Sequence, residues 1–265
     1  MLTLIIAAAV GFAVTLITTR DLGAGWGIFC GVAMLLITQM IIGLIIRKKV
    51  NNINNKIQAI MNEAQAKISR RAQLFSQRPG GNVRMMQQTL EEEQSSALRR
   101  ALSVTDEAKP LYWWNILLKK QINTMKMMFH FQLREFDKVD AMLKDCLLFD
   151  PRSQLIKLVR MFKKEDPALD QYYSKKARRM KGDDVALFAC TYAWMKLKNE
   201  QTDAALAALV DARKRSDNPV LTENWERLIN GKVKHFSNAN FGDVWYSLYL
   251  ETPKFKQQRV QQRPF

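Results

Sequence analysis

Two long apolar runs without a charged side chain, Met1–Thr19 and Trp26–Ile46, occupy residues 1–46. A helix needs about 20 apolar residues to cross the roughly 30 Å of hydrocarbon in a membrane. The second run meets this length comfortably and the first barely reaches it. Because only residues 20–25 separate the runs, we expect a transmembrane helical hairpin with both ends on one side of the membrane.

A cleaved signal peptide is the alternative interpretation of the first run. Such a peptide has a basic segment at its start and small residues at its far end, where it is cut. This run has no basic residue, and its small residues Ala7, Ala8 and Ala9 come too early for a cleavage site. A second apolar run follows directly, which also favours an anchor.

The charges beside the two runs predict the orientation of the hairpin. The basic run 47–49 follows the second apolar run at once, whereas the loop carries only Arg20 and Asp21. Short segments rich in Lys and Arg stay on the cytoplasmic side. We therefore expect both termini and residues 47–265 in the cytoplasm, at a bacterial-type inner (plasma) membrane.

Glycines at helical spacing indicate how the hairpin packs. Gly23, Gly27 and Gly31 recur every four residues, and small residues at this spacing let membrane helices approach closely. Gly27 has two interpretations, helix packing or a place in the turn. Gly31 lies deeper in the run, and we expect it to pack against the first helix.

Residues 47–78 are predicted to form a long juxtamembrane amphipathic helix. Its first apolar residues alternate by three and four, the spacing of a heptad seam; they are Val50, Ile53, Ile57, Ile60 and Ala64. A homodimer through Val50–Ala64 is therefore one prediction. Because a coiled coil normally needs at least three or four heptads, we favour a helix that packs on its own domain or lies on the membrane.

Helix-breaking residues predict the remaining domain boundaries. Pro79-Gly80-Gly81-Asn82 predicts a linker at residues 79–84. Residues 85–251 contain no alternating strand pattern, which predicts a cytoplasmic all-α domain. From residue 110 onward we expect helix breaks roughly every 13 to 18 residues, near residues 134–135, 150–151, 166–167, 182, 199–200, 218–219, 231 and 240. Residues 252–265 are rich in Gln and Lys/Arg without an acid, which predicts a basic, disordered tail.

Two stretches of the helical domain match at an offset of 66 residues. The matched pairs are Val139 with Ala205, Leu143 with Leu209, and Cys146 with Ala212. The later stretch resembles the second helix of a tetratricopeptide repeat, a family with a period of 34 residues whose helices meet at small side chains. Ala193 fits the small position of the first helix.

This resemblance covers about residues 118–230 and implies a TPR-like α-solenoid of helix hairpins that binds partners. It implies helix packing at Ala193, Ala205 and Ala212, and no activity. The intervening unit departs from the pattern, because Tyr172 lies near the position where a small residue is wanted. An irregular helical bundle is the alternative.

The residue types that carry chemistry form no recognisable signature. His130 and His235 are 105 positions apart without cysteine or carboxylate at ligand spacing. The three cysteines, Cys30, Cys146 and Cys190, form no metal or disulfide pattern and are expected to be reduced thiols. No glycine-rich phosphate loop or nucleophile elbow is present. We therefore expect no catalytic residue, no cofactor and no metal, with an enzyme of unrecognised site as an alternative.

A formal net charge of +16 predicts an anionic partner. Residues 152–181 hold ten Lys or Arg against three acids. Six of the basic residues are spaced to share the faces of two successive helices: Lys157, Arg160, Lys164, Lys175, Arg178 and Arg179. Membrane lipid and nucleic acid are the two partners that this patch fits, and two solvated faces are the alternative.

Together these features predict a membrane-anchored scaffold or adaptor that binds partner proteins at the cytoplasmic face, with its basic surface on anionic lipid. The alternative is a membrane-tethered nucleic-acid binder. In that case exposed aromatics beside basic residues, Trp113 and Tyr246, would stack on bases. The same aromatics also suit a membrane interface or a protein core, and core packing is the expectation for Trp114 and Trp245.

Overall fold

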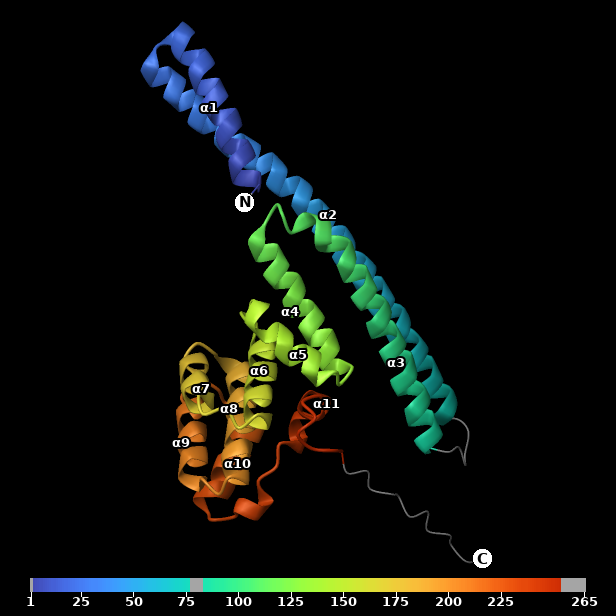
Figure 1. Ribbon diagram of the computed structural model, residues 1–265. Helices are drawn as coiled ribbons and strands as arrows, with labels where there is room; N and C mark the ends of the chain where they lie inside the picture. The colour runs from blue at the N-terminus through green and yellow to red at the C-terminus, as the bar shows by residue number, and fades with distance from the viewer. Residues whose placement is uncertain (1, 77–82, 254–265) are drawn as a thin grey trace, which may run out of the picture. The chain divides into compact units, whose positions relative to one another are not determined.

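The computed structural model of this chain describes residues 2–76 and 83–253 (Figure 1). Every regular element in the described part is a helix and none is a strand, which confirms the expected all-α class. The chain divides into two compact units, Met1–Leu147 (unit 1) and Leu148–Phe265 (unit 2). Each unit is described by itself.

Two long helices, α1 (Leu2–Leu22) and α2 (Ala24–Ser76), form a hairpin in unit 1 (Figure 1). Gly23 joins them with a φ of 84°, a conformation that glycine adopts without strain. Both helices are long and apolar enough to cross a membrane, by length and composition. Large apolar side chains such as Phe12 and Phe29 are exposed along this hairpin, and an extended apolar surface of this kind suits contact with lipid.

Glycines lie where α1 and α2 approach most closely. Gly27 and Gly31 are buried. A Cβ atom at Gly27 would lie 2.9 Å from the Cα atom of Thr19, and one at Gly31 would lie 2.8 Å from the carbonyl oxygen of Gly11. Both separations are too short for a side chain, so this helix contact requires glycine at both positions.

The polar half of α2 packs along α3 (Val83–Thr105) (Figure 1). Ile53 and Ile57 are buried in a core that also contains Ala101. Two ion pairs connect the helices at their surface, Arg71 with Glu93 at 2.9 Å and Arg100 with Glu63 at 3.8 Å. The heptad-spaced stripe therefore faces helices of its own chain, and the homodimer through Val50–Ala64 stays a prediction.

The units divide between Leu147 and Leu148, not at the expected linker. Residues 77–82, which include most of the expected linker 79–84, lie outside the described part, as do residues 254–265 of the expected tail. The sequence groups α3 with the later helices, whereas in the structure α3 turns back along α2. Leu118, in the next long helix, joins the same core, which extends unit 1 toward residue 147.

Four shorter elements complete unit 1: η1 (Asp106–Leu111), α4 (Ile116–Gln132), α5 (Phe136–Met142) and η2 (Leu143–Asp145). Asn115 caps α4, since its side-chain oxygen accepts a hydrogen bond from the Leu117 amide at 2.8 Å. The Lys126 ammonium lies 2.5 Å from the Asp106 carboxylate and thereby ties α4 to η1.

Unit 2 consists of successive short helices. They are α6 (Pro151–Lys163), α7 (Leu169–Ala177), α8 (Gly182–Lys198), α9 (Thr202–Arg213), α10 (Pro219–Ile229), η3 (Val233–His235), η4 (Ala239–Phe241) and α11 (Asp243–Tyr246). Helix α8 is buried along most of its length. The indole nitrogens of Trp194, in α8, and Trp245, in α11, donate to opposite oxygens of the Glu251 carboxylate at 2.7 and 3.0 Å, which fastens the C-terminal segment to α8.

Four helices within residues 2–76 and 83–253 end in the same way. In each, one residue has a positive φ and donates its amide to the carbonyl three residues back, while the next amide reaches five residues back; the positive-φ residues are Arg134, Glu165, Glu200 and Gly231. This pair of hydrogen bonds is the Schellman motif, which normally uses glycine at that position. The four residues are separated by 31, 35 and 31 positions, so each alternate pair repeats the offset of 66.

The three small residues predicted at helix contacts, Ala193, Ala205 and Ala212, are all fully buried in α8 and α9. Val139, the counterpart of Ala205, is fully buried as well. Cys146, the counterpart of Ala212, is only half-buried. The reason is that α5 ends at Met142 and the chain continues in a 3-10 turn. The two matched stretches thus agree at the turn and at the start of the second helix.

Candidate functional site

The basic residues of unit 2 gather around Tyr172, which lies on α7. The Lys157 ammonium, from α6, lies 4.9 Å from the centre of the Tyr172 ring, and the Lys176 ammonium lies 5.9 Å from it. The Tyr172 hydroxyl donates to the carbonyl oxygen of Gln154 at 3.3 Å. The ring is thereby fixed between the two helices and holds cations from both.

Electrostatics show which cations lie close together. The pKa of Lys176 is lowered by burial, and further by the positive charges of Arg179, Lys157 and Lys175. Because like charges act on one another here from both α6 and the end of α7, these residues form one surface. We call Lys157, Lys175, Lys176 and Arg179 the α6–α7 basic cluster.

Three of the six predicted patch residues, Lys157, Lys175 and Arg179, belong to this cluster. Arg178 is exposed beside it. Arg160 lies one turn further along α6 and Lys164 directly follows that helix, and each has interaction partners of its own. Lys176 was missed as a patch residue, although its spacing of four residues from Tyr172 is a signal that could have indicated it.

Two of the three acids of residues 152–181 have partners outside the cluster. Asp166 accepts a hydrogen bond from the Ala168 amide at 2.9 Å. Asp170 accepts from the Tyr192 hydroxyl at 2.9 Å and from the Lys196 ammonium at 2.7 Å. Among the residues that the structure describes, no member of the α6–α7 basic cluster forms a salt bridge. The positive charges of the cluster are therefore not neutralised by a salt bridge within the described residues.

Lys196 is the most buried charged side chain near the cluster, with 8% of it exposed. Its ammonium also donates to the side-chain oxygen of Gln201 at 2.8 Å and lies 5.3 Å from the Tyr192 ring centre. These contacts connect α8 to α7 and to the start of α9. A fully paired lysine of this kind holds helices together rather than acting on a substrate.

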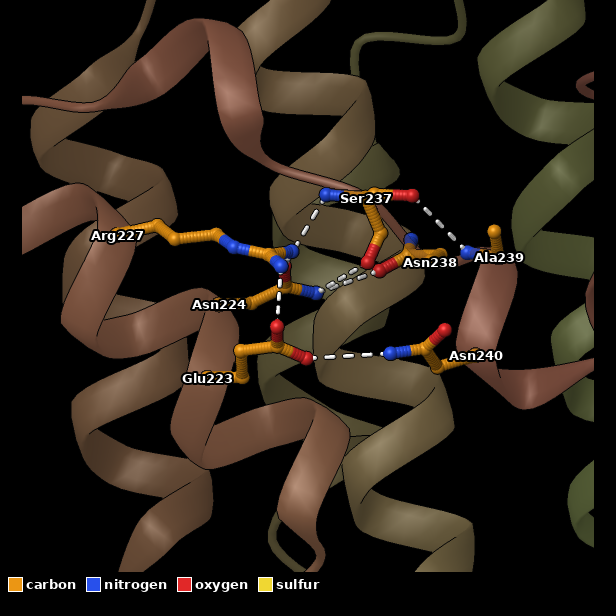
Figure 2. Close-up of polar contacts among 7 residues, drawn as sticks. All are labelled: Glu223, Asn224, Arg227, Ser237, Asn238, Ala239 and Asn240. Atoms are coloured by element: carbon orange, nitrogen blue, oxygen red, sulfur yellow. Dashed lines mark hydrogen bonds and ion pairs between the residues drawn. The ribbon is translucent and has the colours of Figure 1, made fainter.

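A second polar cluster fastens the segment that follows α10, and Figure 2 shows it. Asn224 is fully buried. Its amide nitrogen donates to Ser237 O and Asn238 Oδ1, both at 3.0 Å, and its side-chain oxygen accepts from the Ser237 amide at 3.1 Å and from Arg227 at 3.2 Å. Asn238 in turn donates to the Cys190 carbonyl in α8 at 2.9 Å. Every polar atom of the Asn224 side chain is paired, so its role is structural.

Burial disfavours the reactive thiolate form of Cys146 and Cys190. Burial raises the pKa of Cys190 to about 12 and that of Cys146 to about 11. His130 is half-buried and its Nδ1 lies 2.7 Å from a Glu135 carboxylate oxygen. No group of three or more His, Cys, Asp or Glu within residues 2–76 and 83–253 has the arrangement of a metal site.

The aromatic residues divide between surface and core. Trp113 is 79% exposed, and its carbonyl oxygen accepts a hydrogen bond from the Leu2 amide, at the start of α1, at 3.4 Å. Trp114 and Tyr246 are half-buried, and Trp245 is fully buried. Trp113 therefore lies beside the end of the apolar hairpin, where an indole suits a membrane interface.

Comparison of this chain with protein-family models, with curated proteins and with solved structures returned no match.

Proposed function

We propose that this protein is a membrane-anchored scaffold or adaptor that binds partner proteins at the cytoplasmic face of a bacterial-type inner membrane. The observation that carries this proposal is the recurrence of one helix ending at intervals of 31, 35 and 31 residues. Helix hairpins repeated at such intervals stack into solenoids whose surfaces bind other proteins. A TPR-like arrangement over about residues 118–230 is part of the proposal.

The basic run of unit 1 supports the proposed orientation, and Trp113 suits a membrane interface at the same end of the hairpin. The basic run 47–49 is exposed directly after the apolar part of α2, and such runs stay on the cytoplasmic side. Trp113 is exposed beside the start of α1, at the same end of the hairpin. Both termini then lie in the cytoplasm, together with unit 2.

The α6–α7 basic cluster is the proposed contact with anionic lipid of the cytoplasmic leaflet. Its cations have no carboxylate partner among the described residues. A surface of this kind attracts anionic head groups within a Debye length of the membrane, and unit 2 belongs to the same chain as the proposed anchor.

Crosslinking in intact membranes tests the binding function. The full-length chain is crosslinked and recovered with and without nuclease treatment, and the copurifying proteins are identified. Specific protein partners that resist nuclease are expected. Partners that disappear with nuclease would instead assign the chain to the nucleic-acid binders.

A charge reversal tests the cluster. Replacing Lys175, Lys176 and Arg179 with Glu in the full-length protein should weaken binding of its detergent-solubilised form to vesicles that contain phosphatidylglycerol. The matched control replaces Lys214, Lys232 and Lys234, which are also exposed in unit 2 and change the net charge equally. Equal loss in both variants would mean that net charge alone, and not this cluster, attracts the lipid.

A further inference from the structure

An open-sided cavity of about 290 Å³ lies in unit 1 where the apolar part of α2 ends. One stripe of α2 forms its main wall, with Gln39, Gly43 and Arg47 at successive four-residue steps. Thr3 of α1 and the start of α4, at Asn115, close it from the other sides. Three segments far apart in the sequence therefore meet around one space.

Two groups at the cavity, the amide nitrogen of Gln39 and the guanidinium of Arg47, can donate hydrogen bonds to a ligand. The amide nitrogen of Gln39 is buried and has no hydrogen-bond partner in the described part of the chain. Arg47 is exposed at the opening and forms no ion pair with a described residue. None of the described residues around the cavity is acidic. A buried donor without an acceptor is costly, so an anionic acceptor is the ligand that this wall fits.

The position of the cavity along α2 indicates where that anion comes from. Gln39 and Gly43 lie inside the apolar run 26–46, and Arg47 ends it. Ile46 adds an apolar side chain to the wall. If α2 crosses the membrane as proposed above, the cavity spans the boundary between acyl chains and head groups, which is where lipid phosphates lie.

We propose that this cavity holds the phosphodiester head group of one anionic phospholipid from the cytoplasmic leaflet. Gln39 and Arg47 donate to its phosphate oxygens, and Asn115 is placed to meet the hydroxyl groups of a glycerol head. Guanidinium binds phosphate with strong, directional hydrogen bonds. A head group that ends in an ammonium finds no carboxylate in this wall, so phosphatidylglycerol is preferred to phosphatidylcholine. The site lies in unit 1 and is separate from the α6–α7 basic cluster.

Lipid retention by the full-length protein tests the site. The protein is assembled in nanodiscs with equal amounts of phosphatidylglycerol and phosphatidylcholine and transferred to detergent. Its bound lipid is then counted by native mass spectrometry. The expected result for the unaltered protein is one retained phosphatidylglycerol per chain, in preference to phosphatidylcholine. Equal retention of the two lipids would overturn the proposal.

Filling the cavity gives the sharpest variant. No atom lies within 4 Å of a Cβ placed at Gly43, so Gly43→Leu fills the space without a clash at Cβ and should abolish retention. Gly25→Leu is the matched control, because Gly25 is equally open and lies far along α2 from the cavity. Retention by Gly43→Leu at the level of Gly25→Leu would refute the site.

Removing the cation provides a second, independent variant. Arg47→Gln should lower phosphatidylglycerol retention about tenfold, which corresponds to about 1.4 kcal/mol, whereas Lys49→Gln, in the same basic run, should leave it unchanged. Equal effects would assign the result to general surface charge and overturn the site. Displacement of the lipid by millimolar glycerol 3-phosphate would assign the cavity to a soluble phosphate ester instead.

These outcomes are separable from the proposed function. Loss of lipid by Gly43→Leu from a chain that still inserts into membranes concerns the cavity alone. A chain that does not insert would remove the membrane placement on which both proposals rest.

Discussion

Asn224→Leu tests whether one buried side chain holds the C-terminal segment on unit 2. Asn224 connects α10 to the backbone of Ser237 and to Asn238 (Figure 2). Asn238 itself donates to the Cys190 carbonyl in α8. Leucine has the same heavy-atom skeleton as asparagine and forms none of these bonds. The substitution therefore removes the polar connection while it largely preserves the packing.

The magnitude follows from the hydrogen bonds that are lost. Three bonds of Asn224 reach Ser237 and Asn238, at 3.0, 3.0 and 3.1 Å. A typical hydrogen bond contributes about 1 kcal/mol to stability, and an unpaired buried partner costs more. The bond from Arg227 counts little, because this half-buried side chain also pairs with Glu223. The expected loss in the local free energy of opening is about 3 kcal/mol.

Hydrogen exchange of the full-length protein in detergent measures this loss where it occurs. Amides of residues 237–248 should exchange more than about 100-fold faster, since 1.4 kcal/mol corresponds to tenfold. Asn240→Ala is the control, because Asn240 is exposed and makes one bond, to Glu223, at 3.2 Å; it should change exchange by less than about threefold. Exchange in Asn224→Leu that stays within the range of this control would refute the reasoning.

Three further predictions concern other parts of the chain. Glu200→Gly should raise the free energy of unfolding, measured by hydrogen exchange, by about 0.5–1 kcal/mol. The reason is that Glu200 has a φ of 60°, which a non-glycine residue adopts at a cost; a lower free energy of unfolding would contradict this. The hydrogen bond from Lys126 lowers the pKa of Asp106, so its contribution to stability is present above the unfolded pKa of about 3.9 and is lost as the pH falls through the lowered folded value. Asp106→Asn should therefore reduce the acid sensitivity of thermal unfolding below about pH 4, and unchanged sensitivity would count against the ion pair. In a background without the native cysteines, a cysteine at Ala24 should react with an impermeant thiol reagent outside the cell and one at Thr252 should not; the reverse pattern would invert the proposed topology.

The sequence predicts the helical class well because its signals are local. The apolar runs need only length and composition, and the expected breaks at residues 134–135, 166–167, 199–200 and 231 lie at the four Schellman endings. The course of α3 is not local. Its three consecutive acids at 91–93 suggest a solvated helix, whereas Ala97 and Ala101 form a narrow buried stripe. This stripe is buried because α3 packs against α2, and that contact places α3 in unit 1. Helix-breaking residues carry no information on such a contact, so they could not predict the division at residue 147.

The candidate sites likewise combine local signals, which the sequence shows, with contacts between segments, which it does not show. Spacing along single helices indicated most of the basic residues, but which of them converge depends on how α6 packs on α7. Lys176 joins the α6–α7 basic cluster because Tyr172 positions it beside Lys157. The cavity beside Arg47 has walls from α1, α2 and the start of α4, and no pattern within one segment predicts such a meeting.

The Schellman endings after α4 and after α8 show how the two matched stretches can have the same geometry with little shared sequence. At the turn after α4, His130 bonds to Glu135 at 2.7 Å; at the equivalent positions after α8, Lys196 bonds to Gln201 at 2.8 Å. Both pairs join the same two positions of a Schellman ending with different chemistry, so conservation of geometry needs no conservation of residue type. The second pair has a wider consequence, because Lys196 also holds the carboxylate of Asp170 at 2.7 Å. Asp170 is the acid on α7 closest in sequence to Tyr172, and its engagement by Lys196 leaves the α6–α7 basic cluster without a neutralising neighbour on that helix. Lys196, which stabilises a turn, thereby also affects the charge of the surface that we propose to contact anionic lipid.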